Sequence, residues 1–172
     1  AIEAFKNSKN VNVFIFYPKD RVSEVQRKQM TTTDGDGVFP IEIDGTFDDC
    51  QNIVKDLFND KNFNDEVKLG AINSINWGRI AAQIVYYFTS FKLLNNGPVS
   101  YSVPTGNFGD ILAGWVAKKM GLPIKNLMIA TNENDILSRA LKTGIYSIDK
   151  AKATISPSMD IQISSNFERL LF

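Results

Sequence analysis

The sequence predicts an α/β protein with mostly parallel sheets, helices on both faces, and two lobes. Apolar runs of strand length alternate with segments of helical periodicity along the chain. Some strand candidates lead directly into helices through short loops, an arrangement typical of parallel sheets with crossover helices. The 172 residues, with 44% hydrophobic and 22% charged side chains, can also bury a substantial core.

The first 66 residues are predicted to form part of a small, mobile α/β lobe. The segment 11–17 is rich in β-branched and aromatic residues and is closed by Pro18, which favours a buried strand. A turn at 34–37 precedes a second strand, and Thr46 is a suitable N-cap for the helix that follows. The expected elements are helix 1–6, strand 11–17, helix 21–30, strand 38–43 and the helix after Thr46.

Residues 67–172 are predicted to belong to a larger lobe, because the polar stretch 59–66 lacks periodicity and marks a boundary. A long helix should bury one face that includes Trp77, Ile80 and Val85. Gly121 and Pro123 should stop a later helix. The expected elements are strand 68–75, a helix from Trp77 to about Phe91, strand 98–104, helix 109–120, strand 127–131, helix 135–141 and helix 166–172.

Composition excludes several functions. Nineteen basic residues balance nineteen acidic ones, so we expect neither nucleic acid nor a membrane surface as a partner. Without histidine, a Ser-His-Asp triad or a His-based zinc site cannot form, and we expect no metal. The single Cys50 fits a cytoplasmic location. Because both ends lie within apolar-periodic helices, we expect a fragment whose missing parts cover both ends.

The segment 105–110, Thr-Gly-Asn-Phe-Gly-Asp, joins a strand directly to a helix. Gly106 and Gly109 can adopt positive φ, and successive N–H groups beside a helix N-terminus can bind a phosphate. Neither the nucleotide-triphosphate loop nor the dinucleotide fingerprint is present. Spacing alone leaves a second interpretation open, in which the glycines make a tight turn and Asp110 complements the helix dipole.

The segment 73–79, Asn-Ser-Ile-Asn-Trp-Gly-Arg, offers amide, hydroxyl and guanidinium donors for a second anion. Taken alone, it is better explained structurally. Asn76 or Ser74 would cap the helix, Arg79 would be solvated, and Trp77 would belong to the core.

Together these residues resemble the threonine synthase family, in the longer form found in fungi and many bacteria, which has the pyridoxal-phosphate fold type II. The resemblance covers nearly the whole chain in the family's order. The resembling stretches are 14–18, 29–32, 45–50, 73–79, 104–110, 117–123, 130–135 and 156–171.

The resemblance implies roles for both loops. The first would hold the phosphate of pyridoxal 5'-phosphate, with cofactor-binding residues Thr105, Gly106, Asn107, Phe108, Gly109 and Asp110. The second would bind the substrate phosphate through Asn73, Ser74 and Arg79, with Asn107 nearby. The family converts O-phospho-L-homoserine and water to L-threonine and phosphate, using the cofactor as an electron sink.

The resemblance also implies that the catalytic Schiff-base lysine lies outside this chain, upstream of Ala1. We therefore expect the fragment alone to be inactive and to bind the cofactor weakly or not at all. Two alternatives stay open: another fold type II pyridoxal enzyme, such as a dehydratase or cysteine synthase, and a non-catalytic synthase-like binding protein.

Overall fold

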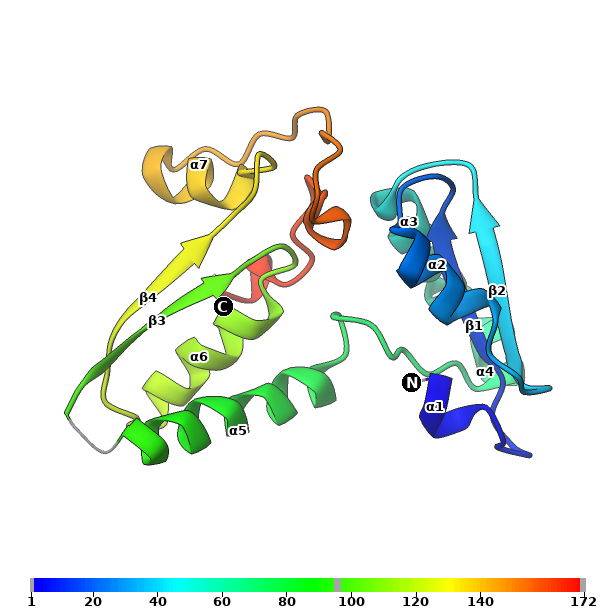
Figure 1. Cartoon of the computed structure of the whole chain (residues 1–172), viewed down its shortest axis with the longest axis horizontal. Helices are drawn as coiled ribbons and strands as arrows, with labels where there is room; N and C mark the ends of the chain where they lie inside the picture. The colour runs from blue at the N-terminus through cyan, green and yellow to red at the C-terminus, as the bar shows by residue number, and fades with distance from the viewer. Residues whose placement is uncertain (1, 95–96, 171–172) are drawn as a thin grey trace. The chain divides into compact units, whose positions relative to one another are not determined.

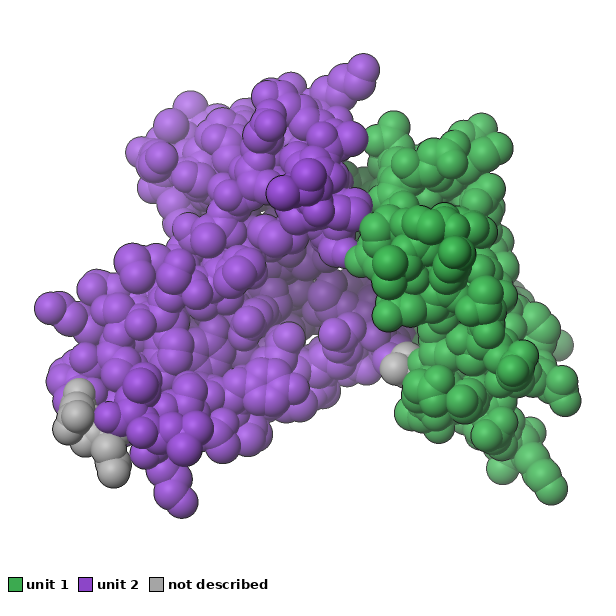
Figure 2. Space-filling model, viewed as in Figure 1, with its two compact units in different colours: residues 1–70 green, residues 71–172 purple. Residues whose placement is uncertain are grey.

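The computed structural model describes residues 2–94 and 97–170, and it divides into two compact units, Ala1–Gly70 and Ala71–Phe172. Figure 2 colours the two units separately. Each unit contains one pair of parallel strands with helices packed against it, as Figure 1 shows. The α/β class and the parallel pairing predicted from the sequence are therefore confirmed.

The first unit is built around strands β1 and β2, which pair in parallel from Val13 opposite Val38 to Pro18 opposite Ile43. Ser23 and Thr46 each form a capping box, which explains where two of its helices begin. Its elements are α1 (Ile2–Phe5), β1 (Val13–Pro18), α2 (Glu24–Thr31), β2 (Val38–Ile43), α3 (Phe47–Asn59) and α4 (Lys61–Val67).

Helix α4 occupies most of the 59–66 stretch, in which the sequence shows no periodicity. The Asp60 side chain accepts a hydrogen bond from the Phe63 main-chain N–H at 3.1 Å and starts the helix. Lys68, in the left-handed region at φ 54°, ends it. The helix is short and mostly polar, so it has too little apolar periodicity to be recognised in the sequence.

The second unit is built around strands β3 and β4, which are parallel and joined by a crossover helix, α6. Figure 1 shows α6 and α7 on opposite sides of this strand pair. A buried apolar cluster from α5, β3, α6 and α7 forms its core. Its elements are α5 (Trp77–Leu94), β3 (Val99–Pro104), α6 (Gly109–Lys119), β4 (Ile124–Ala130), α7 (Ile136–Thr143), and the 3-10 turns η1 (Pro157–Met159) and η2 (Phe167–Leu170).

Three predictions for this unit were wrong. The segment 68–75 forms no strand; asparagine side chains hold it as a turn, with Asn73 Oδ1 accepting from Ile75 N at 3.1 Å. Trp77 is 52% exposed, because α5 turns Ile80 and Tyr87 toward α6 instead. The expected closing helix is a 3-10 turn over Phe167–Leu170, and residues 171–172 lie outside the described residues.

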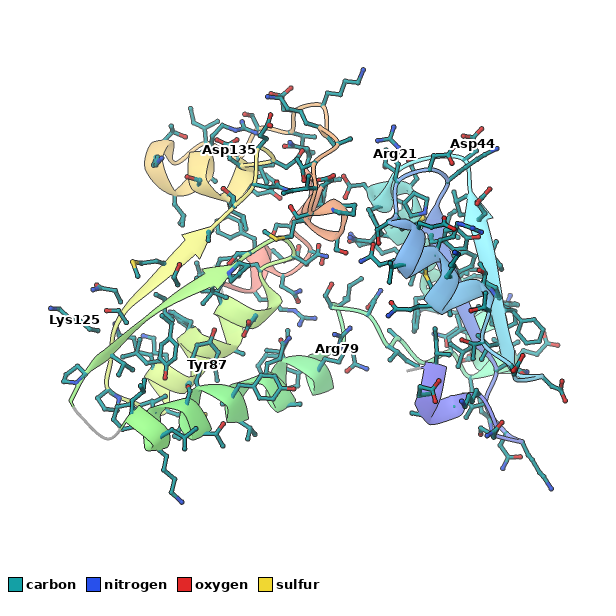
Figure 3. The ribbon with its side chains drawn as sticks, in the orientation of Figure 1. Arg21, Asp44, Arg79, Tyr87, Lys125 and Asp135 are labelled. Atoms are coloured by element: carbon teal, nitrogen blue, oxygen red, sulfur yellow. The ribbon has the colours of Figure 1, made fainter. Side chains whose placement is uncertain are left out.

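Tyr87 and Gly114 set the contact between α5 and α6. A Cβ atom added to Gly114 would lie 2.6 Å from Tyr87 Cζ, so the ring packs directly on the α6 backbone. The Tyr87 hydroxyl points toward Asp110, whose main-chain oxygen and Oδ1 lie at 3.0 and 3.2 Å. Figure 3 shows Tyr87 between the two helices. This contact fixes the first turn of α6, where the candidate site begins.

Within the described ranges, every helix is too short or too polar for a bilayer crossing. The same residues contain no group of three or more histidine, cysteine, aspartate or glutamate side chains arranged to hold a metal ion.

Candidate phosphate-binding site

The turn between β3 and α6 starts as a continuation of the sheet. Thr105 N donates to Ala130 O at 2.8 Å, and the Thr105 hydroxyl donates to Val103 O at 2.6 Å. The Thr105 side chain is therefore buried and engaged at the strand end. An anion in front of the turn would therefore have to be bound by the main-chain N–H groups that follow Thr105.

The left-handed residue of this turn is Phe108, at φ 63°, and neither Gly106 nor Gly109 has positive φ. The sequence-based expectation for the two glycines was wrong on this point. Phe108 is only 4% exposed, and its ring meets Phe167 edge-on with centroids 5.2 Å apart. This packing stabilises a backbone conformation that a phenylalanine rarely adopts.

Packing does not require the two glycines either. A Cβ atom at Gly106 would lie 3.5 Å from Ile161 Cδ1, and one at Gly109 would lie 3.6 Å from Asn166 Nδ2. Both are ordinary van der Waals distances, so alanine would fit against the protein at either position. A tight turn therefore does not account for the two glycines, and the anion-binding interpretation stays open.

Helix α6 begins without a side-chain cap, because its N-cap residue is Phe108. The N–H groups of its first turn therefore carry the partial positive charge of a helix N-terminus. Asp110 lies in this turn, but its carboxylate is within reach of the Tyr87 hydroxyl. Burial, reinforced by this neighbouring carboxylate, raises the pKa of Tyr87, so the phenol remains a neutral donor.

The turn and the 73–79 segment line one cavity of about 150 Å³. Among the described residues that line it, Arg79 alone is cationic, and Figure 3 shows it at the first turn of α5. Its Nη1 donates to Ile72 O at 3.0 Å, which holds the guanidinium beside the segment. The lining residues are Ser74, Arg79, Gln83, Pro104, Thr105, Gly106, Asn107, Phe108, Gly109 and Asp110.

The cavity thus brings together all six predicted residues of the 105–110 turn with Ser74 and Arg79. Asn73, the remaining predicted residue, is not among the lining residues, and its carboxamide oxygen accepts from Ile75 N. Asn76 caps α5, since its Oδ1 accepts from Gly78 N at 2.7 Å.

Sequence reasoning missed Gln83 and the serines and asparagine of the C-terminal coil. Gln83 follows Arg79 by four residues, so helical spacing could have indicated it. Ser164 Oγ donates to Gly106 O at 2.9 Å, and Ser165 Oγ donates to Asn107 Oδ1 at 3.2 Å. These bonds span 58 residues and have no local sequence signal.

The coil that carries these residues is held by the Asp160 carboxylate. Asp160 Oδ1 accepts from Asn132 Nδ2, Asn134 Nδ2 and Thr154 Oγ1 at 2.8, 3.1 and 2.6 Å. Its Oδ2 accepts from Thr154 N at 2.8 Å. Side-chain bonds at the end of β4 therefore anchor a segment that has little regular secondary structure.

The fold and site define an α/β protein with a cavity of about 150 Å³ at a strand-to-helix turn, beside the Arg79 guanidinium. No protein-family model matches the chain. The threonine synthase of Saccharomyces cerevisiae is 58% identical over 100% of the chain and 34% of its own length. The threonine synthase of Pseudomonas aeruginosa is 55% identical over 100% of the chain and 37% of its own length.

Solved structures agree with these relatives. A pyridoxal-phosphate-bound threonine synthase from Brucella melitensis is 56% identical, with a TM-score of 0.83 over 100% of this chain and 38% of that one. The Escherichia coli threonine synthase is 40% identical, with a TM-score of 0.92 over 98% of this chain and 40% of that one. The chain belongs to the threonine synthase family and spans little more than a third of the length of these relatives.

Proposed function

We propose that the chain is part of a cytoplasmic, pyridoxal-phosphate-dependent threonine synthase, a carbon–oxygen lyase. The complete enzyme would convert O-phospho-L-homoserine and water into L-threonine and phosphate. The observation that carries the proposal is the cavity between the 105–110 turn and Arg79, which suits phosphate groups. The high identity to threonine synthases over the whole chain supports this function over a dehydratase or a cysteine synthase.

In this proposal the 105–110 turn holds the phosphate of the cofactor. The N–H groups of Gly106, Asn107, Phe108 and Gly109 would donate to it, with the uncapped α6 N-terminus adding its partial positive charge. Thr105 and Asp110 would support the turn. When bound, pyridoxal phosphate supplies an electron sink for carbanion chemistry. In the complete fold, residues 1–66 would belong to the small mobile lobe and residues 67–172 to the cofactor lobe.

Ser74 and Arg79 would bind the substrate phosphate, with Gln83 beside them and Asn73 shaping the loop. A guanidinium has five donors in a planar fork and is the preferred partner of a phosphate dianion. At a separation of about 4 Å near a protein surface, one charge pair is worth roughly 4 kcal/mol. Arg79 would therefore both bind the substrate and orient the phosphate that leaves.

The test is turnover by the full-length protein. We expect one phosphate released per L-threonine formed from O-phospho-L-homoserine, and a visible absorption band from bound cofactor. Arg79→Leu should raise KM at least roughly tenfold, the equivalent of about 1.4 kcal/mol. Lys92→Leu, an exposed cation at the other end of the same helix, is the matched control and should leave KM unchanged.

Other outcomes would contradict the proposal. A protein that deaminates serine without releasing phosphate would be a dehydratase, and one that binds no cofactor would be a non-catalytic relative. The 172-residue chain alone should give no borohydride-trapped lysine adduct with pyridoxal phosphate. Such an adduct on one specific lysine would show that the Schiff-base residue lies within this chain.

A further inference from the structure

Asn166 connects the two loops that line the cavity. Its Nδ2 donates to Ser74 O at 2.8 Å and to Asn107 O at 2.9 Å. Ser74 belongs to the 73–79 segment and Asn107 to the 105–110 turn, so one side chain spans both. The residue is 0% exposed, which makes each of these bonds costly to lose.

The orientation of the Asn166 amide follows from its partners. Carbonyl oxygens only accept, so the nitrogen rather than the oxygen must face Ser74 and Asn107. The Asn166 main-chain N–H also donates to Asn107 O, at 3.1 Å. The coil is therefore anchored to the turn by its backbone, whereas the link to Ser74 depends on the side chain.

Neighbouring side chains bond to one loop each. Ser164 Oγ donates to Gly106 O in the turn at 2.9 Å, and Arg169 Nη2 donates to Ile75 O in the 73–79 segment at 2.8 Å. The chain thus offers natural controls for the bridging residue. A change at Ser164 or at Arg169 disturbs one wall of the cavity, whereas a change at Asn166 disturbs both.

We propose that Asn166 is a positioning residue that fixes the spacing between the two loops, so that cofactor affinity and substrate affinity are set together. This proposal rests on the proposed function of the two loops. Asn166 does not line the cavity and acts through the main chain of Ser74 and Asn107. Displacements of about 1 Å between binding groups can cost roughly a hundredfold in rate. A residue that fixes the distance between the two loops can therefore have a large effect on binding and turnover.

The experiment measures two quantities in the full-length protein: Kd for pyridoxal phosphate by absorbance titration, and KM for O-phospho-L-homoserine. Competition by inorganic phosphate gives an independent measure of the substrate site. Asn166→Ala should raise Kd, KM and the inhibition constant of phosphate together, each by roughly tenfold, since one carbonyl oxygen in each loop loses the buried Asn166 side-chain donor. Asn166→Asp keeps the shape but turns an acceptor toward two carbonyl oxygens, so its effect should be at least as large.

The controls separate positioning from general destabilisation. Ser164→Ala should raise only the Kd of the cofactor, and Arg169→Gln should raise only KM and the phosphate inhibition constant. If Asn166→Ala does not fold, Asn166→Ser, which keeps one hydroxyl donor, should show the same joint change at smaller size.

The idea is overturned if an Asn166 variant moves only one constant, or if Asn166→Asp behaves like the wild type. Failure of the proposed function is a different result, in which the unmodified full-length protein neither binds the cofactor nor releases phosphate.

Discussion

Replacing Gly114 by alanine should destabilise the protein, although alanine is the better helix former. An added Cβ atom would lie 2.6, 2.7 and 2.9 Å from Tyr87 Cζ, Cε1 and OH. The ring cannot easily move away, because it is 4% exposed, meets Tyr101 edge-on at 4.9 Å and holds Asp110 through its hydroxyl.

The magnitude follows from three contributions. Overpacking a buried contact costs about 1–3 kcal/mol. Loss of the Tyr87 hydrogen bond adds about 0.5–1.5 kcal/mol. Replacing a helix-interior glycine by alanine stabilises the helix by about 1 kcal/mol, which offsets part of this cost. The free energy of unfolding should therefore fall by roughly 0.5–3.5 kcal/mol.

A double-mutant cycle makes this reasoning testable. Urea unfolding, followed by tryptophan fluorescence, gives the free energy of unfolding for each variant. In a Tyr87→Ala background the clash is absent, so Gly114→Ala should become stabilising by about 1 kcal/mol, the helix propensity alone. If Gly114→Ala stabilises the protein while Tyr87 is present, the description of the α5–α6 contact is wrong.

Three further changes test other parts of the molecule. Gly35→Ala would place a Cβ atom 2.6 Å from the Lys6 main-chain oxygen, so urea denaturation should show a loss of about 1–3 kcal/mol, and an unchanged midpoint would refute this. Thr46→Ala removes a capping box and should cost about 1 kcal/mol near neutral pH. Hydrogen bonds from the Thr46 hydroxyl and, to a smaller extent, from the Thr46 N–H lower the pKa of the Asp49 carboxylate below its usual 3.8. The stability that the ionised carboxylate contributes is therefore present above pH 3.8 and is lost as the pH falls through the lower pKa of the folded state. The cost measured by urea denaturation should therefore shrink on acidification below about pH 4, and a cost independent of pH would contradict the assignment. Asp160→Ala removes the acceptor of four hydrogen bonds and should lower the free energy of unfolding by about 1.5–3 kcal/mol. Amide hydrogen exchange should become faster in the C-terminal coil alone. Unchanged exchange in the coil would contradict the role of Asp160 as its anchor.

Strong periodicity and clear caps made much of the fold predictable. Strand 38–43 has the predicted bounds, and Thr46 caps α3 as expected. The errors fall where side chains outside the apolar pattern decide the structure. Asp60 starts a short polar helix, and Asn73 folds the expected strand at 68–75 into a turn.

The site was predictable to the extent that it is local in sequence. The 105–110 turn follows from its place between a strand and a helix, and Arg79 from its position after the 73–78 loop. The left-handed Phe108 was not predictable, because packing against Phe167 stabilises it and only the tertiary structure reveals that contact. Asn166 was missed for the same reason, since its partner Ser74 is 92 residues away.

The most direct test of the central claim is the position of the cofactor's phosphorus atom in a crystal structure of the full-length protein grown with pyridoxal phosphate. We expect the phosphate oxygens within hydrogen-bonding distance, about 2.7–3.2 Å, of main-chain N–H groups between Gly106 and Gly109. A phosphorus atom bound elsewhere, with the turn at 105–110 making no contact to it, would contradict the claim.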